Sequence, residues 1–286
     1  MRHAVGGVHM AMIFETHAHY DDEAFDSDRE ELLASLPAGG VGTVINVGAS
    51  MATTRNSLAL AEKYPFIYAA AGVHPDEVEE LTESCMEELR GYCRQGKTVA
   101  VGEIGLDYHW HKEEEHRKLQ QYWFRRQLAL AREEGLPFII HSREAAADTL
   151  TILKEERAGE IGGVMHCYSY SAKQVREYVG MGLYIGVGGV VTFKNARKLK
   201  EAVEAVPLEN ILLETDCPYM APVPYRGKRN CSLYLPHVAT AIAGLKGVSE
   251  ETVRAATEEN AKRLFGKTAG RQKTGGMCNR GGSEFC

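Results

Sequence analysis

The sequence predicts a single-domain α/β protein built as a (β/α)8 TIM barrel. Short apolar runs alternate with helical patterns along most of the chain, as in folds made of repeated strand-helix units. The chain has 286 residues, and one such barrel takes about 250. Apolar residues make up 44% of it and charged residues 25%, which is typical of a folded globular protein. A doubly wound open sheet is the alternative fold.

Eight strand candidates are short, apolar and often β-branched, as in parallel strands that are buried on both faces. They are Met12–Thr16, Val41–Val47, Phe66–Gly72, Thr98–Gly102, Phe138–His141, Gly163–His166, Leu183–Val187 and Ile211–Glu214. Because a helical pattern follows each run, we expect the strands to be parallel and to close into a barrel.

Helical periodicity fills the gaps between these strands and continues after the last one. In the gaps we expect helices at Arg29–Leu36, Thr53–Lys63, Cys85–Cys93, Glu115–Glu134, Ala145–Glu156, Ala172–Gly180 and Ala196–Val206. Two more, Tyr234–Leu245 and Glu250–Leu264, follow the eighth strand. Gly135 and Pro207 stand where helices are expected to end.

The barrel is expected to span residues 12–266, between two terminal segments. Residues 1–11 and 267–286 lack a hydrophobic period, and we expect a disordered N-terminal extension and a disordered Gly-rich tail. No apolar stretch approaches the ~20 residues of a membrane-spanning helix. The seven cysteines are scattered and include no Cys-x-x-Cys pair, which favours reduced thiols and a cytoplasmic location.

The net charge at pH 7 is −6. This balance excludes a nucleic-acid binder that relies on overall positive charge. A protein of this charge that handles phosphodiesters therefore needs bound cations or a local basic patch.

Metal-binding residue types gather at the ends of the predicted strands. Because the carboxyl ends of barrel strands lie on one face, we expect these side chains to meet at the barrel mouth. Imidazole and carboxylate together suit zinc, manganese or iron, and carboxylate also suits magnesium. The residues are His17, His19, His74, Glu103, His141, His166 and Asp216.

The number of ligands suggests two divalent ions with one shared carboxylate. Residues i and i+2 of a strand project to the same face, so His17 and His19 can hold one ion together. Two ions about 3.5–4 Å apart can activate a water and stabilise a phosphoryl displacement. The expected groups are His17, His19 and Asp216 for one ion, His141 and His166 for the other, and Glu103 as the bridge.

Seven segments, in this order along the chain, resemble the TatD family of metal-dependent deoxyribonucleases, which belongs to the metal-dependent hydrolase superfamily. They are Thr16–His19, Gly72–Pro75, Gly102–Tyr108, His141–Glu144, His166–Ser169, Glu214–Tyr219 and Arg226–Asn230. The resemblance covers about Met12 to Gly266. It implies a TIM barrel that hydrolyses DNA with two divalent ions (Mg2+, Mn2+ or Zn2+) and the same six ligands, with His74 as a phosphate contact.

The leading hypothesis is hydrolysis of phosphodiester bonds in single-stranded DNA or at 3′ ends, because a recessed mouth admits a strand end more easily than a duplex. Asp216 is the candidate that orients or deprotonates the attacking water, and Glu103 is the bridge. Arg226 is expected to clamp phosphate, since Arg pairs bidentately with it. Arg143 and Asn230 are further candidate substrate contacts. A monomer is favoured.

Two other functions stay open. One is a barrel-type amide or ester hydrolase, such as an aminoacyl-tRNA deacylase, which the metal ligands alone do not exclude. The other is a non-catalytic binding protein that keeps a metal-stabilised barrel. The basic residues Lys194, Arg197, Lys198 and Lys200 are interpreted as a solvated helix face rather than a groove that follows a strand.

The sequence departs from the family pattern in three places. Glu15 stands in place of Asp, Tyr170 in place of Gly, and Cys231-Ser232 in place of Glu-Pro after Asn230. Glu15 precedes the ligands in the chain, so we expect it to change the contacts that support the ligands from behind. Tyr170 is expected to narrow the mouth, and Cys231-Ser232 to bear on substrate preference.

Overall fold

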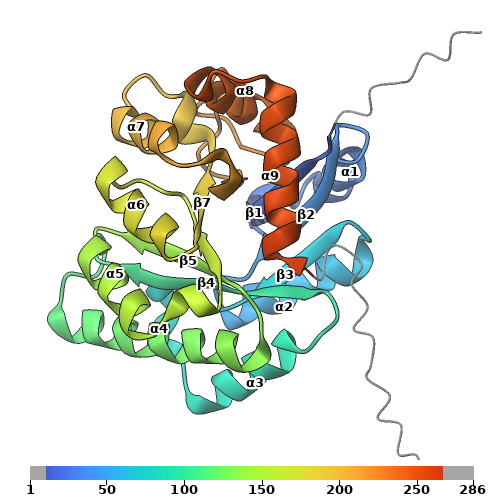
Figure 1. Cartoon of the computed structure of the whole chain (residues 1–286). Coiled ribbons are helices and arrows are strands. Elements are labelled where there is room, and N and C mark those ends of the chain that lie inside the picture. The colour runs from blue at the N-terminus through green and yellow to red at the C-terminus, as the bar shows by residue number, and fades with distance from the viewer. Residues whose placement is uncertain (1–10, 267–286) are drawn as a thin grey trace, which may run out of the picture.

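The computed structural model describes residues 11–266, which form one eight-stranded sheet with helices around it (Figure 1). The strands pair in sequence order, and each neighbouring pair from β1 to β8 is parallel. Their bounds are β1 Ile13–Ala18, β2 Val41–Val47, β3 Ile67–Ala71, β4 Thr98–Asp107, β5 Phe138–Arg143, β6 Gly163–Met165, β7 Tyr184–Val187 and β8 Ile211–Leu213.

The sheet closes between its first and last strands. Ala18 forms a parallel bridge with Cys217, just after β8. The N–H of His19 donates to the carbonyl of Cys217 (2.9 Å), and the N–H of Asp216 donates to the carbonyl of His17 (2.9 Å). The predicted barrel is thereby confirmed, because a doubly wound sheet has its strands out of sequence order and does not close.

Nine α-helices lie among the described residues: seven occupy the gaps between the strands and two follow β8, as the sequence predicts. Their bounds are α1 Arg29–Ser35, α2 Met51–Lys63, α3 Glu83–Cys93, α4 Glu114–Glu134, α5 Ala146–Glu155, α6 Ala172–Gly180, α7 Arg197–Ala205, α8 Leu235–Lys246 and α9 Glu250–Leu264. None of these is both long and apolar enough to cross a membrane. The expectations for residues 1–10 and 267–286 lie outside the described residues.

The prediction that the fourth strand ends at Gly102 is wrong. The apolar run does end there, but β4 continues to Asp107. Its extension pairs with β5, from Ile104 opposite Ile140 to Asp107 opposite Arg143. Glu103 therefore lies inside a strand, at a shift in register between Val101 and Ile104, and its N–H donates to the carbonyl of Gly48 after β2 (2.7 Å).

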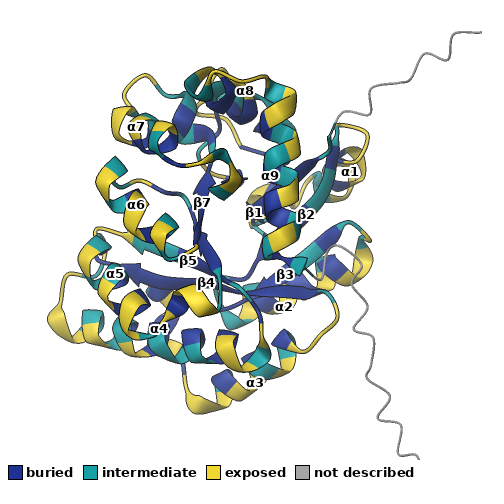
Figure 2. Cartoon of the chain, in the orientation of Figure 1, coloured by how far each residue is buried: buried dark blue, intermediate teal, exposed yellow. Residues whose placement is uncertain are grey.

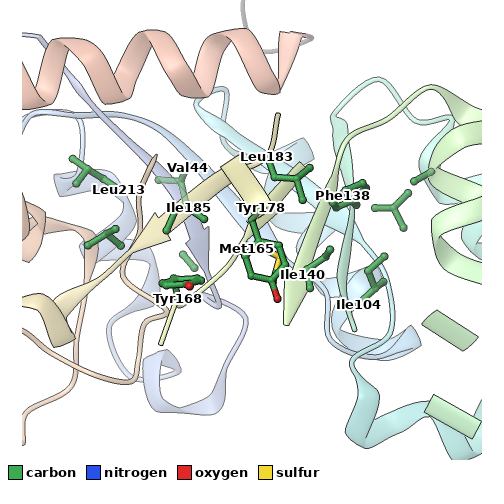
Figure 3. Close-up of a cluster of buried hydrophobic side chains, with 14 of the residues drawn as sticks. Val44, Ile104, Phe138, Ile140, Met165, Tyr168, Tyr178, Leu183, Ile185 and Leu213 are labelled. Atoms are coloured by element: carbon green, nitrogen blue, oxygen red, sulfur yellow. The ribbon is translucent and has the colours of Figure 1, made fainter. Parts of the chain in front are cut away.

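Two apolar clusters fill the barrel, one on each side of the sheet. The larger lies between the strands and the helices. Figure 3 shows part of it, including Phe138, Ile140 and Ile185. The smaller contains the alternate strand residues, which point inward, and Phe265 after α9 stacks on Phe14 of β1 at 6.2 Å between ring centroids. The strands are accordingly buried, while each helix keeps an exposed outer face (Figure 2).

Two buried glutamines of α4 hold the backbone at the mouth end of the barrel. The side chain of Gln127 accepts from the N–H of Val73 (2.8 Å) and donates to its carbonyl (3.0 Å). The side chain of Gln120 does the same to the N–H and carbonyl of Asp107, both at 3.0 Å. Val73 precedes His74 and Asp107 ends β4, so α4 fixes two segments that carry candidate site residues.

Replacing Gln127 with Leu should destabilise the protein by about 2 kcal/mol, because the buried N–H and carbonyl of Val73 would lose their partners. Urea unfolding measures this change in the free energy of unfolding. Gln95→Leu is the control, since Gln95 is exposed, and its effect should stay within about 0.5 kcal/mol. Equal losses in the two variants would contradict this role of Gln127.

Candidate metal centre

The structure brings the seven candidate metal and phosphate residues together at the carboxyl ends of the strands. His17 belongs to β1, Glu103 to β4 and His141 to β5, so these three lie within their strands. The others follow strands: His19, His74, His166 and Asp216 come after β1, β3, β6 and β8. All except the fully buried His17 line a cavity of about 960 Å³.

The carboxylate of Glu103 lies at the centre of this group. It is only 4% exposed. Its Oε2 lies 3.3 Å from Nε2 of His17 and 3.9 Å from Nε2 of His19. Its Oε1 lies 3.0 Å from Nδ1 of His141 and 3.8 Å from Nε2 of His166. The two oxygens therefore face different imidazoles, which is the arrangement that a bridging carboxylate requires.

Asp216 completes the set on the side of β1. Its Oδ1 lies 3.3 Å from Nε2 of His19, 3.6 Å from that of His166 and 3.7 Å from that of His17. The Nε2 atoms of His17 and His19 are themselves 3.1 Å apart. Nitrogen and oxygen donors that converge so closely suit a divalent cation.

Hydrogen bonds orient two of the histidines as ligands. Nδ1 of His19 lies 2.9 Å from the carbonyl of Val47, and a carbonyl only accepts, so this nitrogen carries the proton. Nε2 of His141 lies 2.9 Å from Oδ2 of Asp107, which holds a proton there in the same way. When the ring is neutral, the other nitrogen of each has a lone pair that faces the centre, as is usual for metal-binding histidines.

Glu214 acts on His166 in a similar way. Its Oε2 lies 3.1 Å from Nδ1 of His166, so its charge favours the proton on Nδ1 and leaves Nε2 as the donor to a metal. A Cβ at Gly186 would come within 2.2 Å of this same oxygen. The absence of a side chain at Gly186 therefore gives the Glu214 carboxylate its place.

His74 has the opposite orientation. Its Nδ1 accepts a hydrogen bond from the N–H of Asp76 at 3.2 Å, so the neutral ring carries its proton on Nε2. That Nε2 lies 3.9 Å from Oε1 of Glu103. His74 is close enough to be counted with Glu103 and His141 as a possible ligand group, but its protonated nitrogen is a hydrogen-bond donor.

The electrostatic field of the site favours positive charge. Burial by itself lowers the pKa of an imidazole. The carboxylates around His19, His141 and His166 outweigh this effect and raise the pKa of His19 and His141 to about 9 and that of His166 to about 10. The pKa of Glu103 is well below its usual value despite burial, because His17 and His166 face it. A field that stabilises protonated histidines also stabilises a bound cation, so the residues present fit divalent metal.

Two departures from the family pattern meet behind the centre. Oε2 of Glu15 accepts from the hydroxyls of Thr215 (2.7 Å) and Ser232 (2.9 Å), and its Oε1 accepts from the N–H of His17 (3.1 Å). Glu15 therefore ties β1 to the segment that carries Asp216. The third departure, Tyr170, places its hydroxyl 3.0 Å from Oγ of Ser142, beside His141.

The candidate substrate contacts are not all brought together. Arg143 lines the cavity. Arg226 instead lies over the ring of Phe193, 4.4 Å from its centroid. Asn230 is fully buried, and its amide donates to the carbonyls of Thr215 (3.0 Å) and Tyr219 (2.8 Å).

Sequence reasoning missed four residues of the site. Asp107 and Glu214 lie in the segments Gly102–Tyr108 and Glu214–Tyr219 that resemble the family, but the sequence alone assigns neither of them a role. Arg197 and Lys198, interpreted as a solvated face, line the cavity. Their position near the start of a helix that follows a strand was the available signal, because that is where a barrel presents residues to its mouth.

Comparisons with known proteins agree with this geometry. Residues 14–266 match the family model of TatD-related DNases. The chain is 46% identical over 254 residues to the metal-dependent hydrolase YabD of Bacillus subtilis (strain 168), covering 89% of this chain and 99% of that protein. It is 32% identical over 263 residues to the 3′-5′ ssDNA/RNA exonuclease TatD of Cronobacter sakazakii, covering 90% and 99%.

A solved structure extends the likeness to three dimensions. The fold matches that of YJJV, a TatD homolog from Escherichia coli K12, with a TM-score of 0.83 and 33% identity, covering 90% of this chain and 99% of that one. A hydrolase of the TatD family from Entamoeba histolytica has the same fold, with a TM-score of 0.79. The chain therefore belongs to the TatD-related DNase family and is a metal-dependent hydrolase.

Proposed function

We propose that this hydrolase is a two-metal nuclease that cleaves phosphodiester bonds of single-stranded DNA or of DNA ends in the cytoplasm. The observation that carries the proposal is the placement of the Glu103 carboxylate, whose two oxygens face two separate groups of imidazoles. The name of the Cronobacter relative, a 3′-5′ ssDNA/RNA exonuclease, supports nucleic acid as the substrate class.

The chain offers ligands for two ions, one on each side of Glu103. His17, His19 and Asp216 would hold one ion, and their donor atoms lie within 4.8 Å of one another. His141 and His166 would hold the second. When bound, Mg2+, Mn2+ or Zn2+ would make hydroxide available at neutral pH and would neutralise charge on the phosphate.

Two residues of the chain act on the reacting groups in this proposal. Asp216 has one oxygen turned toward three imidazoles, and its carboxylate orients the attacking water and accepts its proton. His74 presents Nε2–H to the cavity and donates a hydrogen bond to a phosphate oxygen. That donation stabilises the negative charge that builds up on the phosphate.

Hydrolysis of a labelled single-stranded oligonucleotide tests the function directly. We expect shortening of the strand with added Mg2+, Mn2+ or Zn2+, complete loss with a chelator, and slower cleavage of a blunt duplex. The pure protein, the metal-free protein and the reconstituted protein are compared at one concentration. Cleavage that resists the chelator, or turnover of an ester or amide substrate without any of DNA, would overturn the proposal.

Glu103→Gln should remove one of the two ions and lower hydrolysis about a thousandfold, because the amide keeps one good oxygen ligand and loses the charge. Elemental analysis should fall from about two ions per chain to about one, with an unchanged circular dichroism spectrum. Glu79→Gln is the matched control, since Glu79 is exposed and pairs with His116 away from the centre. Near wild-type hydrolysis by the folded Glu103 variant would refute the bridge.

His74→Gln should keep both ions and lower hydrolysis about 10- to 100-fold, the effect of one lost hydrogen bond to a charged group. Both ions should stay bound because Nδ1 of His74 already accepts a hydrogen bond from the N–H of Asp76 and its Nε2 carries a proton, so neither nitrogen is a metal ligand. His141→Gln, made in parallel, should lose an ion. If the His74 variant loses an ion as well, His74 is a ligand and its assigned tautomer is wrong.

A further inference from the structure

The cavity above the metal centre extends well beyond the ligands, toward α7. On that side it is lined by Arg143 at the end of β5, Ser169 after β6, Gly188 after β7 and residues 195–199 at the start of α7. Because β5, β6 and β7 are neighbours in the barrel, these residues form one continuous rim.

Charge is distributed unevenly around this mouth. The cationic residues that line the cavity lie on the rim from β5 to α7. Apart from Glu214, which is buried against His166, the acidic side chains outside the ligand group lie on the opposite side, after β1 and β3. The cations are Arg143, Arg197 and Lys198, and the acids are Asp21, Asp22 and Asp76. A polyanion is attracted to the first side and repelled from the second.

The three cations are available to bind an anion. Arg197 is 84% exposed and contacts Glu201 at 3.8 Å, a weak surface pair. Lys198 and Arg143 are exposed as well. Arg143 lies over the ring of Trp110, 5.5 Å from its centroid, a contact that leaves the edge of its guanidinium free to donate to a phosphate. In contrast, Arg229 of the loop after β8 is engaged by both carboxylate oxygens of Asp28. The exposed basic side chains that face the cavity are therefore those of the β5–α7 rim.

We propose that Arg143, Arg197 and Lys198 bind the phosphates next to the one that is cleaved, so that a single strand leaves the metal centre across β6 and β7 toward α7. The inference rests on the proposed nuclease function and adds to it the path of the substrate. Since phosphate contacts carry no sequence information, binding along this rim is independent of base sequence and weakens steeply with salt.

The test compares two double variants that remove the same charge from one segment. Arg197→Ala/Lys198→Ala removes the cations that line the cavity, and Lys194→Ala/Lys200→Ala removes two neighbours that do not. Binding of fluorescent oligothymidylates of two and eight nucleotides is measured by anisotropy in a chelator, over a series of salt concentrations. KM for both lengths is measured with divalent ions.

The wild-type protein and the Lys194/Lys200 variant should bind the longer strand more tightly than the shorter one. In the Arg197/Lys198 variant we expect this gain to shrink about tenfold, and the slope of log K against log salt to become shallower by about 1.4, or about 0.7 for each lost phosphate contact. KM for the longer strand should rise in parallel.

Three results would overturn the proposed path. Equal losses in the two double variants would mean that overall charge acts at long range. A loss with Arg226→Ala, and none with Arg197→Ala/Lys198→Ala, would direct the strand toward the loop after β8. Either of these leaves the nuclease function standing if the wild type cleaves the strand, whereas a wild-type protein that cleaves no oligonucleotide removes that function together with the path.

Discussion

The burial of one carboxylate governs the architecture of this protein's mouth. Glu103 lies inside the fourth strand and is almost fully shielded from water, where an unpaired charge is very costly. Imidazoles from β1, β5 and the segment after β6 supply the compensation. These imidazoles can reach Glu103 only if the strand ends converge. The chemistry of the mouth therefore depends on the closure of the barrel.

The order of strands and helices could be predicted because each element is marked by a pattern within its own short stretch of sequence. Each strand is a short apolar run, and each ligand candidate stands at or near the end of such a run. The end of β4 could not be found in this way, since Glu103 interrupts the apolar run while pairing with β5 continues to Asp107. Polar residues within a strand look like a strand end when only the sequence is read.

The roles that the sequence left open depend on contacts between distant segments. Nothing local shows that Asp107 orients His141, or that Val47 supplies the carbonyl for His19. Likewise Arg197 and Lys198 face the cavity only because α7 begins at the rim. His74 is the exception, because the N–H of Asp76, two residues further along the chain, decides which nitrogen of the His74 ring carries the proton.

The two glutamines of α4 also set a limit on how this chain can change. Gln120 and Gln127 stand seven residues apart, about two turns, so they share one face of the helix. One residue inserted between them would turn the second away by about 100° and release either the segment before His74 or the end of β4. The residues on the outer face of α4 can vary freely, but the number of residues between Gln120 and Gln127 cannot change.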